Sequence, residues 1–383
     1  MKGAIMANKP DLIPKELISK VPVFDSKIPI TKVIPAIQKN EAVLINKQGV
    51  FYGVIDTRAI YKAGMRLKLS KDMSAERFAV RTPKVMRSTG MNDLISYFYK
   101  VQAKALPFVS DGKIIGVIKR STLLKMMLSL SLIEKGVQVG NIMTSPILAI
   151  ASDASMSQAK SAMEKNKVKR LVVLDSGKFS GLLTHSDMVT KYASTNERAP
   201  EIKKNVYNPS NIPVSGIYNK NPVAADAQTS IIDAIRLMIE RGISSLIVTR
   251  HNNPVGILTV SDILEYLISQ RGIEENKILL SGFDEKTYQY IGEVRDSVKE
   301  FLSKTEKIKG ADINYISLRV RAIKSDQYEI NIRASLRSFG TLQVHETDFL
   351  LDRTLAKALE KLKKEIIKLK EKRNSYEHYK DVL

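Results

Sequence analysis

Apolar and polar positions along this chain of 383 residues form blocks that repeat. Residues 139–189 and 215–264 each predict a short strand, a helix with a period near 3.6, a buried strand (RLVVLD, SLIVTR), a turn, a second strand and a second helix. The predicted order is β-α-β-β-α. Residues 86–127 follow this order less closely, and residues 28–61 follow it least. One order at a regular spacing indicates internal repeats.

The chain after residue 270 follows a different pattern. KILLSGFD (277–284) predicts a strand, and residues 285–307 predict an amphipathic helix. Residues 313–323 and 327–339 alternate with period two, GTLQVHETD (340–348) predicts a third hairpin-connected strand, and a long helix is expected from 349 to about 373. The order β-α-β-β-β-α implies a sheet with both helices on one face. The predicted fold class is therefore α/β repeats followed by an α+β domain.

The two clearest repeats end in nearly the same turn, GLLTHSD (181–187) and GILTVSD (256–262). A glycine allows close backbone approach beside a ligand. A Thr hydroxyl at the strand end can donate to a phosphate or ribose oxygen. The Asp, in the first helical turn, can accept from ribose hydroxyls, and the helix N-terminus favours an anion. Thr-x-x-Asp is also a helix cap that needs no ligand, so both interpretations stay open.

The first two repeats depart from this turn. GVIDTRA (53–59) has Asp56 at the Thr position and Ala59 at the Asp position, and GVIKRST (116–122) has Lys119 and Thr122 there. An acidic group would repel an anion, and loss of the Asp removes the ribose acceptor. We expect this pair of repeats to bind nucleotide poorly.

These strings and this order resemble cystathionine-β-synthase (CBS) domains, two tandem pairs of which form two Bateman modules. The resemblance places the first module at 1–137, the second at 138–270 and a separate domain at 271–383. CBS domains commonly hold adenosine nucleotides at these turns, which implies AMP, ADP or ATP as a regulatory ligand. The implied ligand residues are Thr184, Asp187, Thr259 and Asp262, with Ile147 and Val223 against the base. Pairing of such modules into homodimers is also implied.

The last domain resembles the ribosome hibernation-promoting factor family. The resemblance rests on LSGF, on the Arg-bearing alternating strands and on ETDFLLDRTLAKALEKLKKEIIKLKEKR. It implies that this domain binds ribosomal RNA in the mRNA and tRNA channel of the small subunit and blocks translation. Whether the large subunit is also contacted stays open.

The net charge of the chain also favours binding to RNA. The chain carries a formal charge of +21, and residues 1–140 account for +14 of it. Such an excess attracts polyanions, although a solvated surface is the alternative. The predicted RNA contacts are Arg58, Lys62, Arg66 and Lys68 in the first repeat pair, Arg319, Arg321, Arg333 and Arg337 on the polar face of the last sheet, and Lys357, Lys361, Lys364 and Lys368 on the terminal helix.

Other features narrow the class of protein. There are no cysteines, the four histidines are scattered, and no nucleophile, Walker or dinucleotide motif is present, so we expect no catalysis and no metal site. No apolar run is long enough for a membrane span and no secretory signal is seen, so a cytoplasmic protein is expected. Residues 193–211 are expected to form a mobile loop.

The function predicted from the sequence is a ribosome-associated hibernation factor that responds to adenine nucleotide. A nucleotide-sensing CBS regulator that docks on another protein is the alternative, and a general RNA or DNA binder is a third candidate.

Overall fold

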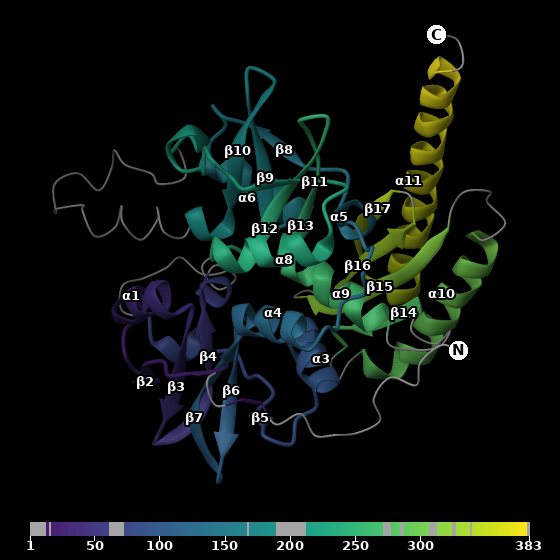
Figure 1. The fold of residues 1–383 in the computed structure, drawn as a ribbon. Coiled ribbons are helices and arrows are strands. Elements are labelled where there is room, and N and C mark those ends of the chain that lie inside the picture. The colour runs from purple at the N-terminus through teal and green to yellow at the C-terminus, as the bar shows by residue number, and fades with distance from the viewer. Residues whose placement is uncertain are drawn as a thin grey trace. The chain divides into compact units, whose positions relative to one another are not determined.

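The computed structural model describes residues 13–14, 17–60, 73–166, 168–188, 212–270, 277–283, 287–305, 312–323, 327–337 and 339–380 (Figure 1). The chain forms two compact units, one made of 1–132 with 184–209, the other of 133–183 with 210–383. Each unit is described by itself. The predicted loop at 193–211 lies outside the described residues.

The first unit contains two sheets built in the same way. One sheet has the order β2-β3-β4 and the other the order β1-β7-β6-β5. In each, a short strand runs parallel to a buried strand that forms a hairpin with the next, as in Phe24↔Ile45 and Val85↔Phe108. The strands are β1 Ile18–Ser19, β2 Val23–Asp25, β3 Ala42–Lys47, β4 Val50–Asp56, β5 Val85–Met86, β6 Ala105–Ser110 and β7 Lys113–Lys119, and the helices are α1 Ile30–Asn40, α3 Met91–Val101 and α4 Arg120–Ser129.

The second unit begins with a second pair of this kind. Its sheets are β10-β9-β8 and β11-β12-β13, and the parallel registers Ile150↔Val173 and Ala225↔Val248 repeat those of the first pair. The elements are α5 Val139–Ile142, β8 Ala149–Ala151, α6 Met156–Lys165, β9 Arg170–Asp175, β10 Lys178–Thr184, β11 Ala224–Asp226, α8 Ile231–Glu240, β12 Ser245–Arg250, β13 Asn253–Thr259 and α9 Val260–Gln270.

Apolar side chains from both sheets of a pair meet in one cluster. In the second pair, Val172 and Leu182 from one repeat pack with Ile247 and Ile257 from the other. The helices begin where the sequence supplies caps: the Ser155 hydroxyl accepts from the Gln158 amide, and the Ser230 hydroxyl accepts from the Asp233 amide. The two repeats of a pair therefore share a core, and neither buries its sheet alone.

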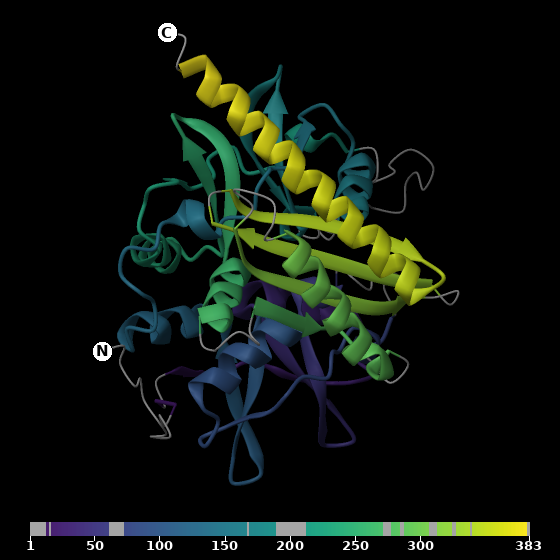
Figure 2. The same ribbon diagram turned by 90° about the vertical axis from the view of Figure 1, so that its right-hand side faces the viewer.

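The rest of the second unit is a four-stranded sheet, β14-β15-β16-β17, with β14 parallel and the others antiparallel. Figure 2 shows α10 and α11 crossing the same face of it. Val294 and Val298 of α10 and Leu355 and Leu362 of α11 enter one core with the strands. The elements are β14 Ile278–Ser281, α10 Ile291–Thr305, β15 Ile313–Ile323, β16 Gln327–Leu336, β17 Gly340–Asp348 and α11 Leu351–Lys380.

The predicted fold class is confirmed, with β-α-β-β-α repeats followed by a β-α-β-β-β-α sheet domain. Strands β15 and β17 have the predicted bounds. Helix α11 continues to Lys380 rather than ending near Arg373.

Candidate functional site

Both Gly-x-x-Thr-x-x-Asp turns form the same small network at the point where a strand passes into a helix. The amide of Thr259 donates to Asp262 Oδ2 at 2.6 Å, and the amide of Asp262 donates to Thr259 Oγ1 at 3.4 Å. In the other turn the amide and the hydroxyl of Thr184 donate to Asp187 Oδ2 at 2.8 and 2.7 Å. These are reciprocal caps, so the capping interpretation of the motif describes part of its role.

The glycines of all four turns serve a purpose that differs from the predicted one. Each lies against the backbone of the segment that leads into the other repeat of its pair. A Cβ at Gly256 would lie 3.0 Å from the carbonyl oxygen of Thr144, and one at Gly53 would lie 2.9 Å from that of Val80. Gly116 and Gly181 are crowded in the same manner. The close approach is therefore to the chain itself, and these glycines join the two repeats of a pair.

This junction brings one more polar residue to the turn of the last repeat. Thr144 exchanges backbone hydrogen bonds with Ile257, at 2.9 and 3.0 Å. Its hydroxyl donates to Asp262 Oδ1 at 2.9 Å. A cap needs nothing from another repeat, so the convergence of Thr144, Thr259 and Asp262 goes beyond capping. Thr144 was not among the residues predicted from the sequence, because it lies outside the Gly-x-x-Thr-x-x-Asp turn.

A second unforeseen residue reaches the same carboxylate. Arg333, on β16, donates through Nη2 to Asp262 Oδ1 and, at 2.9 Å, to Thr144 Oγ1. Its Nε lies 3.1 Å from Glu265 Oε2. Burial works against the charge of Arg333, but Glu265 and Asp262 outweigh it and raise the pKa of the guanidinium above its usual value, so it stays charged.

Arg333 was predicted as an RNA contact on the polar face of the last sheet, and in the structure it contacts Asp262 and Glu265. Residues of α5 and α9 contact β15, β16 and β17 on the face opposite α10 and α11. Ser317 and Ser335, which the alternation places on the polar face, are buried there. A sequence with period two cannot distinguish a face covered by solvent from one covered by another domain. Arg333 would have to leave two carboxylates to contact a phosphate.

The two residues expected against a base lie between the repeats. Ile147 is half-buried and packs against the shared apolar cluster of the second pair. Val223 is also half-buried, and its carbonyl accepts from the amide of Ile247 at 3.0 Å.

In the first repeat pair, Asp56 fills its own turn. This buried carboxylate accepts from the amides of Arg58, Ala59 and Lys104, each at 2.9 Å. Burial opposes its ionisation, but the charge of Arg58 and the amides of Lys104 and Ala59 outweigh this and lower the pKa of Asp56. Asp56 thus takes the position where the turns of the second pair have Thr, and Arg58 balances its charge.

Most of the other predicted RNA contacts are paired with acids of this chain. Arg58 holds Asp56 through Nε and Nη2, at 3.2 and 2.9 Å. The four lysines of α11 lie between 2.6 and 2.8 Å from carboxylates; the pairs are Lys357–Asp348, Lys361–Glu346, Lys364–Glu360 and Lys368–Glu365. Arg321 lies 4.0 Å from Glu329, Arg319 is half-buried and Arg337 is exposed. Lys62, Arg66 and Lys68 lie outside the described residues.

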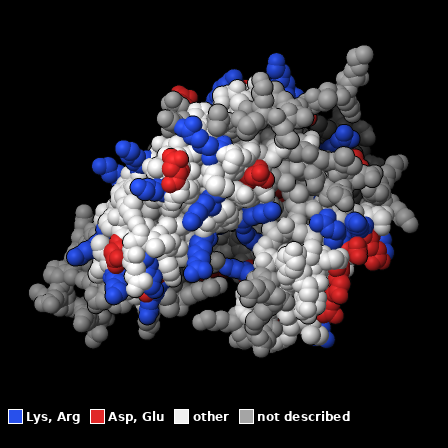
Figure 3. Space-filling model, turned by 90° about the horizontal axis from the view of Figure 1, so that it is seen from below, with Lys and Arg blue, Asp and Glu red and all other residues white. Residues whose placement is uncertain are grey.

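Figure 3 shows Lys and Arg side chains spread widely over the face in view, with Asp and Glu among them. One group in the first unit also combines cations with aromatic rings. Lys47 and Arg81 lie 5.3 and 5.9 Å from the ring centre of Tyr52, and Lys84 lies 6.0 Å from that of Phe51. Phe51, Tyr52, Arg81, Thr82 and Lys84 line a pocket of about 230 Å³. We call these five residues and Lys47 the aromatic–cation surface.

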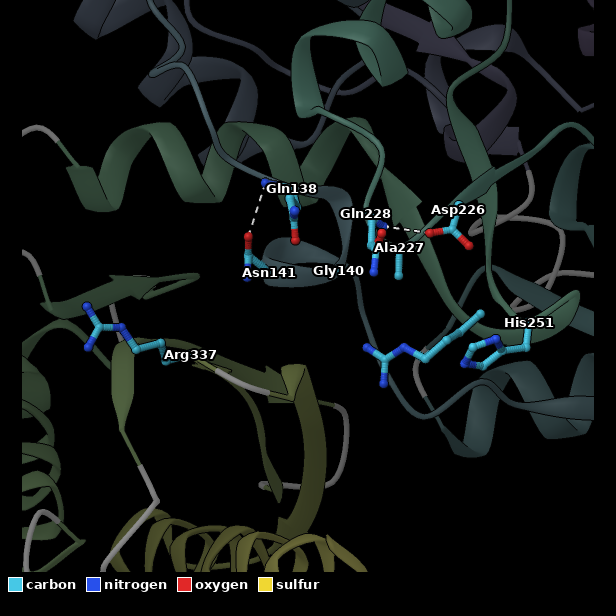
Figure 4. Close-up of a pocket in the computed structure, with 9 residues that line it drawn as sticks. Gln138, Gly140, Asn141, Asp226, Ala227, Gln228, His251 and Arg337 are labelled. Atoms are coloured by element: carbon cyan, nitrogen blue, oxygen red, sulfur yellow. Dashed lines mark hydrogen bonds between the residues drawn. The ribbon is translucent and has the colours of Figure 1, made fainter. Parts of the chain in front are cut away.

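A larger pocket, of about 470 Å³, lies in the second unit (Figure 4). Its lining comes from the start of α5, the loop after β11, the β12–β13 turn and the end of β16; it consists of Gln138, Gly140, Asn141, Asp226, Ala227, Gln228, Arg250, His251 and Arg337. His251 and Arg337 lie on opposite sides of the opening (Figure 4). Because β13 separates His251 from Thr259, this pocket is not the Thr259–Asp262 turn.

Within the described residues, no group of three or more His, Cys, Asp and Glu side chains is placed to hold a metal ion. The same part of the chain has no helix that is both long and apolar enough to cross a membrane.

Comparisons with known proteins agree with the repeat structure. Residues 139–194 and 214–269 match the family model described as "CBS domain". An uncharacterised protein of Methanocaldococcus jannaschii is 24% identical over 315 residues, which cover 79% of this chain and 73% of that protein. An uncharacterised 33.4 kDa protein of Thermofilum pendens, named for its place in a ribosomal RNA operon, is 23% identical over 254 residues, covering 60% of this chain and 81% of that protein.

A solved structure shares the fold of the repeats. It is a protein of Methanocaldococcus jannaschii, described as a candidate archaeal homologue of g-AMPK, with 15% identity and a TM-score of 0.55; the match covers 66% of this chain and 98% of that one. Two repeat pairs with the same registers, and a family match over the second pair, lead to one conclusion. Residues 139–194 and 214–269 are a pair of CBS domains, and the two sheets of the first unit have the same parallel registers.

Proposed function

We propose that the second CBS pair binds an adenine nucleotide, AMP, ADP or ATP, and that the chain is a nucleotide-responsive regulator. The observation that carries this proposal is the meeting of Thr144 from one repeat with Thr259 and Asp262 from the other. Hydroxyls and a carboxylate that converge at the start of a helix suit a ribose and its phosphate. The resemblance to CBS domains, which commonly hold adenosine nucleotides at this turn, supports the ligand class.

Isothermal titration of the full chain with AMP, ADP and ATP tests this function. Asp262→Asn and Asp187→Asn keep the size of each side chain and remove its charge, so each should weaken binding at its own turn about tenfold or more, since a hydrogen bond to a charged group contributes about 1.5–3 kcal/mol. Asp226→Asn is the matched control, because Asp226 is exposed and ends strand β11, elsewhere in the pair. Absence of heat and of any rise in Tm with all three nucleotides would refute the proposal.

A second candidate function, RNA contact by the first CBS pair, is favoured by the aromatic–cation surface. Rings on which bases can stack, beside cations that can meet phosphates, are typical of surfaces for single-stranded nucleic acid. Arg81 and Lys84 are both exposed there. Binding to ribosomal RNA and ribosome hibernation remain predictions from the sequence. Co-sedimentation with ribosomal particles on a sucrose gradient would separate them from a sensor that docks on another protein.

A further inference from the structure

Arg333 lies where a nucleotide ribose is expected to bind. Its guanidinium contacts Asp262, the acceptor predicted for ribose hydroxyls, and donates to Thr144 at 2.9 Å. The Asp262 and Glu265 side chains are 0% and 1% exposed, whereas that of Arg333 is 21% exposed. All three residues belong to the second unit. Arg333 comes from the sheet domain, whereas Asp262 and Glu265 come from the last CBS repeat.

Asp262 uses most of its acceptor capacity in this arrangement. Its Oδ2 accepts from the Thr259 amide, and its Oδ1 accepts from Thr144 and Arg333. A ribose hydroxyl needs the same carboxylate, and it needs the space beside it that the guanidinium fills. Nucleotide and Arg333 cannot both occupy this position.

The backbone beside Thr144 is tied to the sheet domain as well. The Thr341 amide donates to the Met143 carbonyl at 2.7 Å, and the Ser145 amide donates to the Thr341 carbonyl at 2.9 Å. Gly340, at φ +75°, lies where a Cβ would be 2.8 Å from the Met143 carbonyl. The segment 143–145, which completes the candidate site, is thus hydrogen-bonded to the start of β17. A movement of this segment at the site would therefore also move or break its contact with the sheet domain.

We propose that Arg333 and an adenine nucleotide compete for Asp262, so that nucleotide binding at this turn releases the sheet domain from the second CBS pair. This inference rests on the proposed function. It gives the ligand different affinities for two states, docked and released, which is the requirement for a ligand to shift a conformational equilibrium. By the same linkage, any partner that binds the released sheet domain raises the affinity for nucleotide.

The first test measures nucleotide affinity with the competitor removed. In an Asp187→Asn background, AMP and ATP report on the Asp262 turn. Arg333→Met should raise their affinity about tenfold or more, because no guanidinium then competes with the nucleotide for Asp262. Arg337→Met is the matched control, since Arg337 follows the same strand but is exposed. Equal affinity with and without Arg333, or no binding at this turn even in Arg333→Met, overturns the inference.

The second test uses the unmodified chain, because Arg333→Met leaves two buried carboxylates and can impair folding. Hydrogen–deuterium exchange at the Ser145 and Thr341 amides reports docking, and saturating ATP or AMP should speed it at least several-fold. Unchanged exchange with nucleotide bound at Asp262 overturns the inference and leaves the proposed function intact. Absence of nucleotide binding to the wild type and to every variant rejects both.

Discussion

At the scale of single residues, side chains of the chain itself occupy the positions where the sequence suggests a ligand. Asp56 fills the turn of the first repeat, and Arg333 covers Asp262 in the last. In each pair the carboxylate is buried and held by an arginine, and removal of one partner of such a pair strongly destabilises the protein.

Replacement of Asp56 should therefore reduce stability in a pH-dependent way. Asp56→Asn removes the buried charge that pairs with Arg58 and leaves one accepting oxygen where there were two, and we expect a loss of about 2–4 kcal/mol at pH 7. The folded-state pKa is lowered, so the contribution of Asp56 is fully present above its unfolded pKa near 3.8 and is lost as pH falls through the lower folded value.

Urea unfolding of wild type and Asp56→Asn at pH 7, 4 and 3 provides the measurement. The difference between the two proteins should shrink as pH falls below about 4. Asp93→Asn, an exposed carboxylate in the first turn of α3, is the control and should change stability little. A pH-independent difference between wild type and Asp56→Asn would contradict the proposed ionisation of Asp56.

Spacing alone made Thr259 and Asp262 predictable, because a turn of seven residues contains both. Thr144 and Arg333 were out of reach of the same reasoning, since they stand 118 and 71 residues from Asp262. Their placement depends on how repeats and domains pair. A local pattern carries no information on that pairing.

At the scale of elements, the spacing of apolar residues predicts the strands and helices well. It predicts less well what covers each face of a strand. β15 alternates as expected, with Ile316, Leu318 and Val320 fully buried against the helices. Its opposite face was predicted to be polar and to contact RNA, yet Tyr315 and Ser317 are buried on it. Alternation identifies two faces of a strand, and only the tertiary structure tells which of them is covered.

The glycine of each repeat turn lets the turn pack against the segment that leads into the other repeat. In the first unit, substitution of Gly53 tests the importance of this contact. Gly53→Ala would place a methyl group 2.9 Å from the Val80 carbonyl oxygen and 3.2 Å from Ala79 Cβ. We expect a loss of about 1–3 kcal/mol, typical of overpacking.

The control is Gly90→Ala, where the nearest atom to a Cβ, in Asp93, is 3.8 Å away. Chemical denaturation compares the two variants. Equal stability of Gly53→Ala and Gly90→Ala would show that the leading segment moves aside without cost.

At the scale of the whole molecule, fewer cations are free to bind a polyanion than the net charge of +21 suggests. The α11 lysines and Arg58 lie beside acids, so their charge is partly compensated within the chain. The α11 lysines are exposed, and ion pairs of exposed side chains are weak, at about 0–1 kcal/mol, so a polyanion can compete for these lysines. Cations without such a carboxylate neighbour are the better test of RNA contact.

Arg81→Glu with Lys84→Glu should weaken association of the full chain with RNA, and the salt dependence should become flatter. Loss of two phosphate contacts lowers the slope of log affinity against log salt by about 1.4 for single strands. Filter binding to a single-stranded RNA across a salt series measures both quantities. Lys178→Glu with Lys220→Glu, in the second pair, is the control with the same change in charge. Equal slopes for the two double variants would reject the aromatic–cation surface as the contact.

The alternation of side chains along β16 affects how binding to a truncated chain should be interpreted. Ile332 and Ala334 point into the core of the sheet domain, while Arg333 between them points at the CBS pair. A fragment ending near residue 270 would keep every predicted ligand residue yet expose Asp262 and Glu265 to water. Dissociation constants obtained with such a fragment would describe an unobstructed receptor, and they would overstate how readily the intact polypeptide responds to its ligand.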